Sequence, residues 1–300
     1  MAISEAISGC VLTHRTLIRM GGMDKLDFLQ GLVSNDMGKL TPESSLYTIL
    51  LSPQGRFQFD LIVHQVGDDW FLEVDADRAA SLMKRLTLFK LRSDVTLELT
   101  QDRSILSIWG SMVASVLEMA AAAGATQTTS LWTAIIDPRL PELGARLIIN
   151  SSALEKVQHC LGLVLVDLSS YKAHRYTLGV PEGAAELEVD RAIPLECGMD
   201  ELNAIDWNKG CYMGQELTAR TRYRGLVRKR IFTAYSGTAD LSQPILGDDQ
   251  EVGQWIAKEG EVGLAMIRVS AVNKDLQCDG TRVKITQPHW MKLPDVNDET

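Results

Sequence analysis

Hydrophobic positions along the first hundred residues follow the period of a strand in some stretches and that of a helix in others. Residues 11–20 are rich in β-branched and apolar side chains, which predicts a strand, and apolar side chains at helical spacing predict a short helix over residues 24–33. Residues 56–66 alternate between apolar and polar side chains, so we expect a hairpin strand with one buried face. Further elements are expected as a helix at 76–90 and strands at 46–51, 70–74 and 95–99.

A similar order of elements appears after residue 100. Strands are expected at 104–109, 131–136 and 146–149, and helices at 111–123 and 151–161. Two α+β units of similar order predict a pair of ferredoxin-like subdomains. A further helix is expected at 167–178. Beyond it, short strands separated by glycine-containing turns predict a β-barrel, with strands at 231–235, 252–256, 261–269 and 281–285. The expected fold class is therefore α+β with a C-terminal β-barrel.

The length of 300 residues exceeds that of one typical domain. We expect a first α+β subdomain at 1–100, a second at 101–225 and the barrel at 226–300. The net charge of −9 argues against general binding to nucleic acid or a membrane surface, and no apolar run approaches the ~18–20 residues of a membrane-spanning helix. The first residues resemble neither a secretory signal nor an Arg-rich presequence, so we expect a cytoplasmic location, or the mitochondrial matrix if the chain is eukaryotic and processed.

The cysteines are odd in number, widely spaced and without a C-x-x-C pair. This pattern is typical of free thiols in a reducing compartment rather than of a disulfide framework. It also argues against a zinc site, or an iron–sulfur cluster held by this chain alone, because both need several closely spaced ligands. No metal site is therefore predicted among the five, which are Cys10, Cys160, Cys197, Cys211 and Cys278.

One cysteine, Cys211, lies in surroundings that favour chemistry. Gly210 and Gly214 flank it, so the backbone can turn tightly there or approach a ligand closely. Good helix formers begin at Gln215, which places Cys211 just ahead of an expected helix N-terminus, and Lys209 lies two residues away. Both features favour a thiolate. The alternative is a small buried residue in a glycine-rich turn, which is how most free cysteines behave.

The motif Lys209-Gly210-Cys211-Tyr212-x-Gly214-Gln215-Glu216 resembles the signature of the YgfZ-type folate-binding proteins. These are relatives of the glycine-cleavage T protein, an aminomethyltransferase. The run that follows, as far as Arg230, is most similar to the branch containing the mitochondrial iron–sulfur cluster assembly factor. Residues 28–36, 55–60 and 193–196 also match family segments. The resemblance implies a T-protein-like ring of two interleaved α+β subdomains and a barrel, with folate in its central opening.

The resemblance also implies which residues bind folate. Tyr171 falls where relatives place an aromatic ring beside folate, and a ring face suits stacking on the flat pterin. Glu196 is placed to accept hydrogen bonds from a pterin amino group. The expected folate-binding residues are Arg56, Asp60, Tyr171, Arg175, Glu196, Lys209, Gly210, Gln215, Glu216 and Arg222. Plainer interpretations stay open, namely a core tyrosine, a turn cap at Glu196 and two solvated charges at Arg56 and Asp60.

Residues 220–230 carry six basic side chains and no acidic one, in a chain that is acidic as a whole. Arginine binds carboxylates through two parallel hydrogen bonds, so this run, which includes Arg222, suits the glutamate tail of a folate. A strand with solvated charges is the ordinary alternative, and the net charge of the chain disfavours an RNA-binding edge.

The leading functional prediction is a tetrahydrofolate-binding protein that supports assembly or repair of iron–sulfur enzymes, with Cys211 as its reactive group. Its expected partners are folate and either iron–sulfur assembly proteins or client iron–sulfur enzymes. One alternative is a folate-dependent aminomethyltransferase. Relatives with that activity usually lack a cysteine at the Cys211 position, and they use an aspartate that neither Asp60 nor Asp94 clearly matches. The other alternative is a non-catalytic adaptor, and the sequence leaves open whether the chain is an enzyme.

Overall fold

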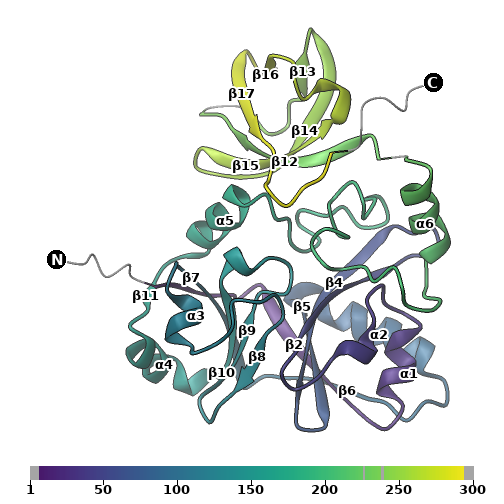
Figure 1. Cartoon of the computed structure of the whole chain (residues 1–300), viewed down its shortest axis with the longest axis vertical. Coiled ribbons are helices and arrows are strands. Elements are labelled where there is room, and N and C mark those ends of the chain that lie inside the picture. Colours follow the sequence, from purple (N-terminus) through teal and green to yellow (C-terminus); the bar gives the residue numbers. More distant parts are fainter. Residues whose placement is uncertain (1–6, 226, 238–239, 294–300) are drawn as a thin grey trace. The chain divides into compact units, whose positions relative to one another are not determined.

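The computed structural model describes residues 7–225, 227–237 and 240–293, and the course of the chain is shown in Figure 1. Contacts divide the chain into two compact units. Unit 1 contains the described residues of Met1–Leu51, Gln58–Leu168 and Leu202–Met213, and unit 2 those of Ser52–Phe57, Ser169–Glu201 and Gly214–Thr300. Each unit is thus assembled from segments far apart in the sequence. The three expected ranges, 1–100, 101–225 and 226–300, stay a prediction about domain organisation.

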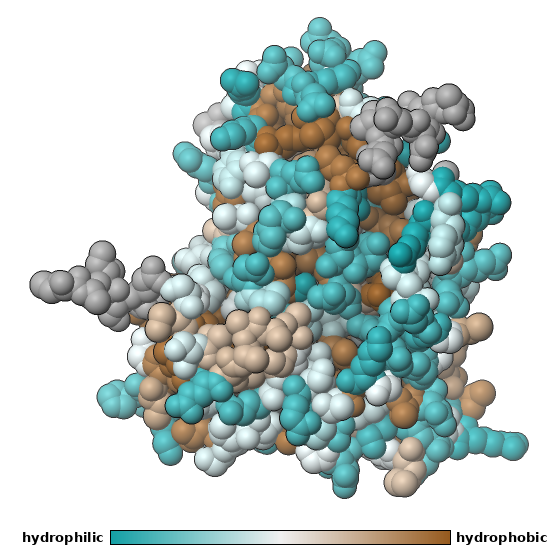
Figure 2. Space-filling model, viewed as in Figure 1, coloured by the Kyte–Doolittle hydropathy of each residue, from teal (hydrophilic) through white to brown (hydrophobic). Residues whose placement is uncertain are grey.

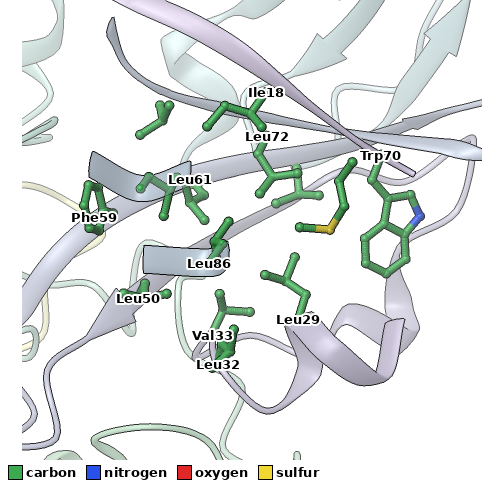
Figure 3. Close-up of a cluster of buried hydrophobic side chains, with 14 of the residues drawn as sticks. Ile18, Leu29, Leu32, Val33, Leu50, Phe59, Leu61, Trp70, Leu72 and Leu86 are labelled. Atoms are coloured by element: carbon green, nitrogen blue, oxygen red, sulfur yellow. The ribbon is translucent and has the colours of Figure 1, made fainter. Parts of the chain in front are cut away.

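A five-stranded sheet and two helices form one part of unit 1. The strand order is β3-β4-β5-β2-β6. One face of the sheet and both helices share an apolar core that includes Leu29, Leu61 and Leu86 (Figure 3). The elements are β2 (Arg15–Gly21), α1 (Lys25–Gln30), β3 (Leu46–Leu51), β4 (Phe57–Val66), β5 (Asp69–Asp75), α2 (Ala79–Lys90) and β6 (Thr96–Leu99).

A six-stranded sheet forms the other part of unit 1, in the order β11-β1-β7-β10-β9-β8. Its apolar core is separate and includes Leu106, Leu147 and Val157. The elements are β1 (Ser8–Val11), β7 (Arg103–Trp109), α3 (Val113–Val116), β8 (Thr126–Thr128), β9 (Trp132–Ile136), β10 (Ala145–Asn150), α4 (Leu154–Leu161) and β11 (Val164–Leu165). The strand expected at 11–20 is confirmed over residues 15–20, which belong to β2, but its start is wrong, because residue 11 ends β1 in the other sheet.

The strand β4 is buried on both faces, which corrects the expectation of one buried face. Every residue from Phe57 to His64 is buried. Phe59 and Leu61 enter the core of Figure 3, whereas Asp60 alternates with them and lies on the opposite face of the sheet. An alternating sequence looks the same whether its polar side meets water or a buried polar interface, so the pattern did not reveal the second face.

The polar face of β4 and its neighbours belongs to a buried ion-pair network between the two sheets of unit 1. Arg15 on β2 contacts carboxylate oxygens of Asp60 at 3.2 Å, Glu73 at 3.1 Å and Asp75 at 2.7 Å. Arg146 on β10 of the other sheet reaches the same Glu73 at 3.2 Å. The side chains of Arg15, Glu73 and Arg146 are at most 1% exposed. Buried charges need partners, and here the partners come from both sheets.

The helix expected at 111–123 is wrong over most of its length. The structure has only the four-residue α3, and Glu118 already has a left-handed φ of 54°. The alanines at 120–123 are all exposed, so a longer helix has no apolar face to bury there. Helix propensity alone rarely holds a short helix, and most helical stability in proteins comes from such burial.

Unit 2 contains two helices and a closed six-stranded barrel with the order β12-β15-β14-β13-β16-β17. The barrel core includes Phe232, Trp255 and Ile267. This confirms the α+β fold class with a C-terminal barrel. None of the helices in the described ranges has the length and hydrophobicity needed to cross a membrane. The elements are α5 (Leu168–Thr177), α6 (Gln215–Tyr223), β12 (Lys229–Tyr235), β13 (Ile245–Gly247), β14 (Gln250–Glu259), β15 (Val262–Arg268), β16 (Leu276–Cys278) and β17 (Thr281–Thr286).

Candidate functional site

The lysine of the cysteine motif anchors its own segment. The Lys209 ammonium donates hydrogen bonds to the carbonyl oxygens of Gln30 at 2.8 Å, Val33 at 2.5 Å and Asn35 at 2.7 Å. These carbonyls lie at and just beyond the C-terminal end of α1, where intrahelical partners run out. Burial lowers the Lys209 pKa to about 8, although Asp36 and Asp206 act in the opposite direction. Lys209 therefore holds residues 202–213 against the end of α1.

The cluster Ser34-Asn35-Asp36 completes this attachment. The Ser34 hydroxyl donates to the carbonyl oxygen of Ala204 at 2.6 Å, and the Asn35 side-chain amide donates to that of Asn203 at 2.8 Å. The backbone N–H of Asp206 donates in return to the Ser34 carbonyl at 3.0 Å. The end of a helix does not by itself require this polar cluster. Its hydrogen bonds to residues 203–206 explain why polar side chains occur here. Sequence spacing gave no signal for those partners.

Cys211 is exposed and lies between the exposed Gly210 and the buried Tyr212. Tyr212 is buried, with the Lys209 ammonium 5.2 Å from its ring centroid, and the backbone N–H of Met213 donates to the Gly31 carbonyl at 3.3 Å. The thiol is thus presented from a segment that is fixed on both sides. Cys160 on α4 is also exposed, whereas Cys10, Cys197 and Cys278 are buried. Burial is the largest influence on the Cys197 thiol and raises its pKa to about 12.

Two motif glycines of unit 2 meet where the turn at 52–56 packs on the start of α6. Gly55 has a φ of +68°, and a Cβ there would lie 3.1 Å from the Gly214 carbonyl oxygen and 3.1 Å from the Leu217 Cβ. Gly214 itself has a left-handed φ of 81° and precedes Gln215, the first residue of α6. The expectation that a helix begins at Gln215 is confirmed. Glu216 follows in the first turn and is exposed.

Arg56 and Glu196 come together in unit 2, beside part of the basic run. Burial raises the pKa of the half-buried Glu196 carboxyl, and this is opposed by the charges of Lys229 and Arg56 and by backbone N–H groups of Arg228 and Lys229. Arg56 also donates to the Arg191 carbonyl oxygen at 2.9 Å. A carboxylate flanked by cations can accept hydrogen bonds from a ligand while the cations attract negative charge.

Asp60 does not share a strand face with Arg56. Arg56 precedes β4 and belongs to unit 2, whereas Asp60 lies within β4 in unit 1. Asp60 is also not a solvated charge, because its side chain is 2% exposed and paired with Arg15. Its expected contact with folate stays a prediction.

Tyr171 and Arg175 belong to a buried network in unit 2. The Tyr171 hydroxyl donates to Glu182 at 2.8 Å, and Arg175 binds both oxygens of Glu186 at 2.6 and 2.7 Å. Burial disfavours the charge on Arg175, but Glu186 and Glu182 outweigh it and raise its pKa well above the ordinary value. Tyr171 is 1% exposed. Stacking of a ligand on its ring would need this network to open, and the acidic partners were not identified from the sequence.

The basic run at 220–230 divides into exposed and buried side chains. Arg230 is buried and pairs with Glu201. The exposed members are Arg220, Arg222, Arg224, Arg228 and Lys229. Figure 2 shows hydrophilic residues gathered over α6 at the right edge of the view. Within the described residues, no group of three or more histidine, cysteine, aspartate or glutamate side chains is arranged to hold a metal ion.

Known proteins resemble this chain along most of its length. The GCVT N-terminal domain family matches residues 1–135, and the CAF17 C-terminal beta-barrel domain family matches residues 228–293. The human mitochondrial iron–sulfur cluster assembly factor IBA57 is 33% identical over 304 residues, which cover 93% of this chain and 84% of the human protein. The chain belongs to the IBA57 family. The expected likeness to the iron–sulfur assembly branch is thereby confirmed.

The other comparisons concern a fungal IBA57 homologue and the fold. The mitochondrial homologue of Neurospora crassa is 38% identical over 243 residues, which cover 76% of this chain and 54% of that protein. Aminomethyltransferase T of the Bartonella henselae glycine cleavage system superposes with a TM-score of 0.78 at 14% identity, covering 96% of this chain and 87% of that one. At this identity the likeness concerns the fold alone, and it confirms the expected T-protein-like fold of this IBA57 family member.

Proposed function

We propose that this chain supports iron–sulfur cluster assembly through the Cys211 thiol, with tetrahydrofolate as a bound cofactor. The observation that carries the proposal is an exposed thiol on a segment held in place by Lys209 and Tyr212. Thiolates are the usual ligands of iron–sulfur clusters, and a single thiol suits transient contact with a cluster intermediate rather than permanent binding. Membership of the IBA57 family supports the same process.

The folate part of the proposal draws on unit 2. Glu196 provides an acceptor for a pterin amino group, and Arg56 and the exposed Arg222 supply positive charge for the glutamate tail. Gln215 and Glu216 start the helix beside them. Among the other residues named for folate, Lys209 serves internal structure, and Gly210 is exposed beside Cys211.

The aminomethyltransferase alternative needs an aspartate that acts beside folate. Asp60 is already paired with Arg15 inside the sheet interface. Asp94 lies in the loop before β6, where one carboxylate oxygen accepts a hydrogen bond from the backbone N–H of Met23 at 3.3 Å. These engagements favour the assembly function over transferase chemistry. The relatives named above are mitochondrial, so we extend the proposal to the mitochondrial matrix if this chain is eukaryotic, in place of the cytoplasm.

Replacement of Cys211 in cells tests the thiol. Cells that lack their own IBA57-family gene would receive the wild-type chain, Cys211→Ser or Cys160→Ser, and the activities of [4Fe–4S] enzymes would be compared at equal protein level. We expect Cys211→Ser to lose most of the restored activity and Cys160→Ser, which removes the other exposed thiol, to retain it. Equal restoration by both variants would remove Cys211 from the proposal.

Calorimetry with tetrahydrofolate under anaerobic conditions tests the cofactor separately. We expect saturable binding near micromolar affinity, about −8 kcal/mol. Glu196→Gln and Arg222→Gln should each weaken it about tenfold, because each removes a charge-assisted hydrogen bond. Arg282→Gln, at a side chain that is 84% exposed on the barrel, is the matched control. Absent binding, or equal weakening by all three variants, would refute the folate site.

A further inference from the structure

Unit 1 contains a small cavity that involves none of the residues discussed for folate. Its volume is about 270 Å³. Residues of β4 and β5 line one side, and residues of β9, β10 and the turn between β8 and β9 line the other. The lining residues that matter most are His64, Phe71, Arg103, Trp132 and Ile148.

Two buried polar groups on this cavity lack partners. Among the described residues, neither ring nitrogen of His64 has a hydrogen-bond partner, and the residue is 1% exposed. The Trp132 Nε1–H, from the opposite side, is also buried and unpaired in the described part of the chain. Native structures pair nearly all such groups with protein, water or a ligand. Their position on the cavity therefore points to an occupant with polar atoms.

The rest of the lining indicates the chemistry of that occupant. The rings of His64 and Phe71 are stacked with centroids 5.3 Å apart and planes inclined by 15°, which provides an aromatic wall. Val66 and Ile148 add apolar surface. Arg103 is 44% exposed, and its contact with Asp102 is long at 3.9 Å, so the guanidinium is available to an anion.

We propose that this cavity binds a small planar aromatic carboxylate. The ring packs against the apolar and aromatic lining, the carboxylate meets Arg103, and polar ring substituents meet His64 and Trp132. The volume suits one ring, since cavities for drug-sized ligands start near 300 Å³. None of its lining residues is among those named for folate, and none belongs to the cysteine motif.

Benzoate and its neutral amide, benzamide, are matched probes for this proposal. Titration of the full chain followed by ligand-observed NMR should show saturable benzoate binding with a dissociation constant of about 1 mM or tighter. Arg103→Gln should weaken benzoate about tenfold and leave benzamide unchanged, because only benzoate offers a charge to the guanidinium. Arg92→Gln removes another exposed charge from the same unit and should leave the binding of both probes unchanged.

A second readout locates the bound probe. Benzoate should shift the imidazole resonance of His64, identified by its loss in His64→Gln, because the bound ring packs beside His64 and Phe71. The proposal is overturned if benzoate binding does not saturate, if Arg92→Gln weakens it as much as Arg103→Gln, or if benzoate binds without shifting the His64 resonance.

Discussion

The Lys209 ammonium lies 2.5 Å from the carbonyl oxygen of Val33, a residue 176 positions earlier in the chain. Together with the bonds to Gln30 and Asn35, this contact joins the cysteine segment to the end of α1. Lys209, which its position in the sequence predicts to favour the Cys211 thiolate, instead directs its ammonium at these carbonyl oxygens. The position of Cys211 therefore depends on a structural hydrogen-bonding centre.

Lys209→Met is expected to lower the free energy of unfolding by about 2–4 kcal/mol, because three carbonyl oxygens lose a charged donor and two of these hydrogen bonds are buried. Urea denaturation measures the change. Lys39→Met is the matched control, since Lys39 also contacts this segment, through Asp206, but its side chain is 59% exposed. Lys39→Met should lower the free energy of unfolding by less than about 1 kcal/mol. A similar cost for both variants would contradict the anchoring role of Lys209.

Arg15→Met is expected to destabilise the protein by about 3–5 kcal/mol, because it removes the cation that pairs with the buried Asp60 and leaves Glu73 paired with Arg146 only. Arg19→Met, four residues along the same strand, removes a cation that is 48% exposed and should lower the stability much less than Arg15→Met does. The midpoints of denaturant unfolding measure the stability of the two variants. If Arg15→Met unfolds no more easily than Arg19→Met, the network between the sheets contributes no net stability.

His64 should make stability depend on pH. Burial lowers its pKa from 6.5 to about 3, so the folded state resists a proton that the unfolded state accepts. The contribution is fully present above pH 6.5 and is lost as pH falls toward 3, at about 1.4 kcal/mol per pH unit. Between pH 6.5 and 5 the wild type should lose about 2 kcal/mol more than His64→Gln. The exposed His159→Gln should keep the wild-type slope, and a slope unchanged in His64→Gln would refute the assignment.

Gly55→Ala should cost more than Gly67→Ala, although both glycines have positive φ. At Gly55 the new Cβ meets the Gly214 carbonyl oxygen at 3.1 Å, whereas at Gly67 no described atom lies within 4 Å. We expect Gly67→Ala to lower the free energy of unfolding by about 1 kcal/mol, because of backbone strain. Gly55→Ala should lower it by about 2–3 kcal/mol, because crowding adds to that strain. Thermal melting of both variants measures the difference, and equal costs would show that the turn moves away from α6 freely.

Local features of the fold were predictable from the sequence. The helix that begins at Gln215 and most barrel strands follow from propensity and alternation, and these depend only on neighbouring residues. The short strands β13 and β16 were missed, yet the turns after them contain Asp248-Asp249 and Asp279-Gly280, all with positive φ. Such pairs favour tight hairpins and were available as a signal.

Long-range partnerships were not predictable from one sequence. Nothing near Asp60 in the sequence indicates that Arg15 will neutralise it, and nothing near Tyr171 indicates that its ring is enclosed. In the candidate site, exposure of Cys211 and proximity of Arg56 to Glu196 also depend on how distant segments pack. Motif spacing located the residues but did not show which of them serve structure and which face a ligand.

The interleaving of the two units limits how the protein can be divided. The chain passes between them after residues 51, 57, 168, 201 and 213, so no single cut yields either unit intact. During synthesis on the ribosome, the barrel strands are therefore made last. The segment at 52–57 is made early, but its partners lie more than a hundred residues downstream. One example is the Ala192 carbonyl oxygen, which accepts a hydrogen bond from the Phe57 N–H. Premature termination between residue 57 and the cysteine motif should leave both units incomplete, which makes truncated chains targets for proteolysis rather than partly active proteins.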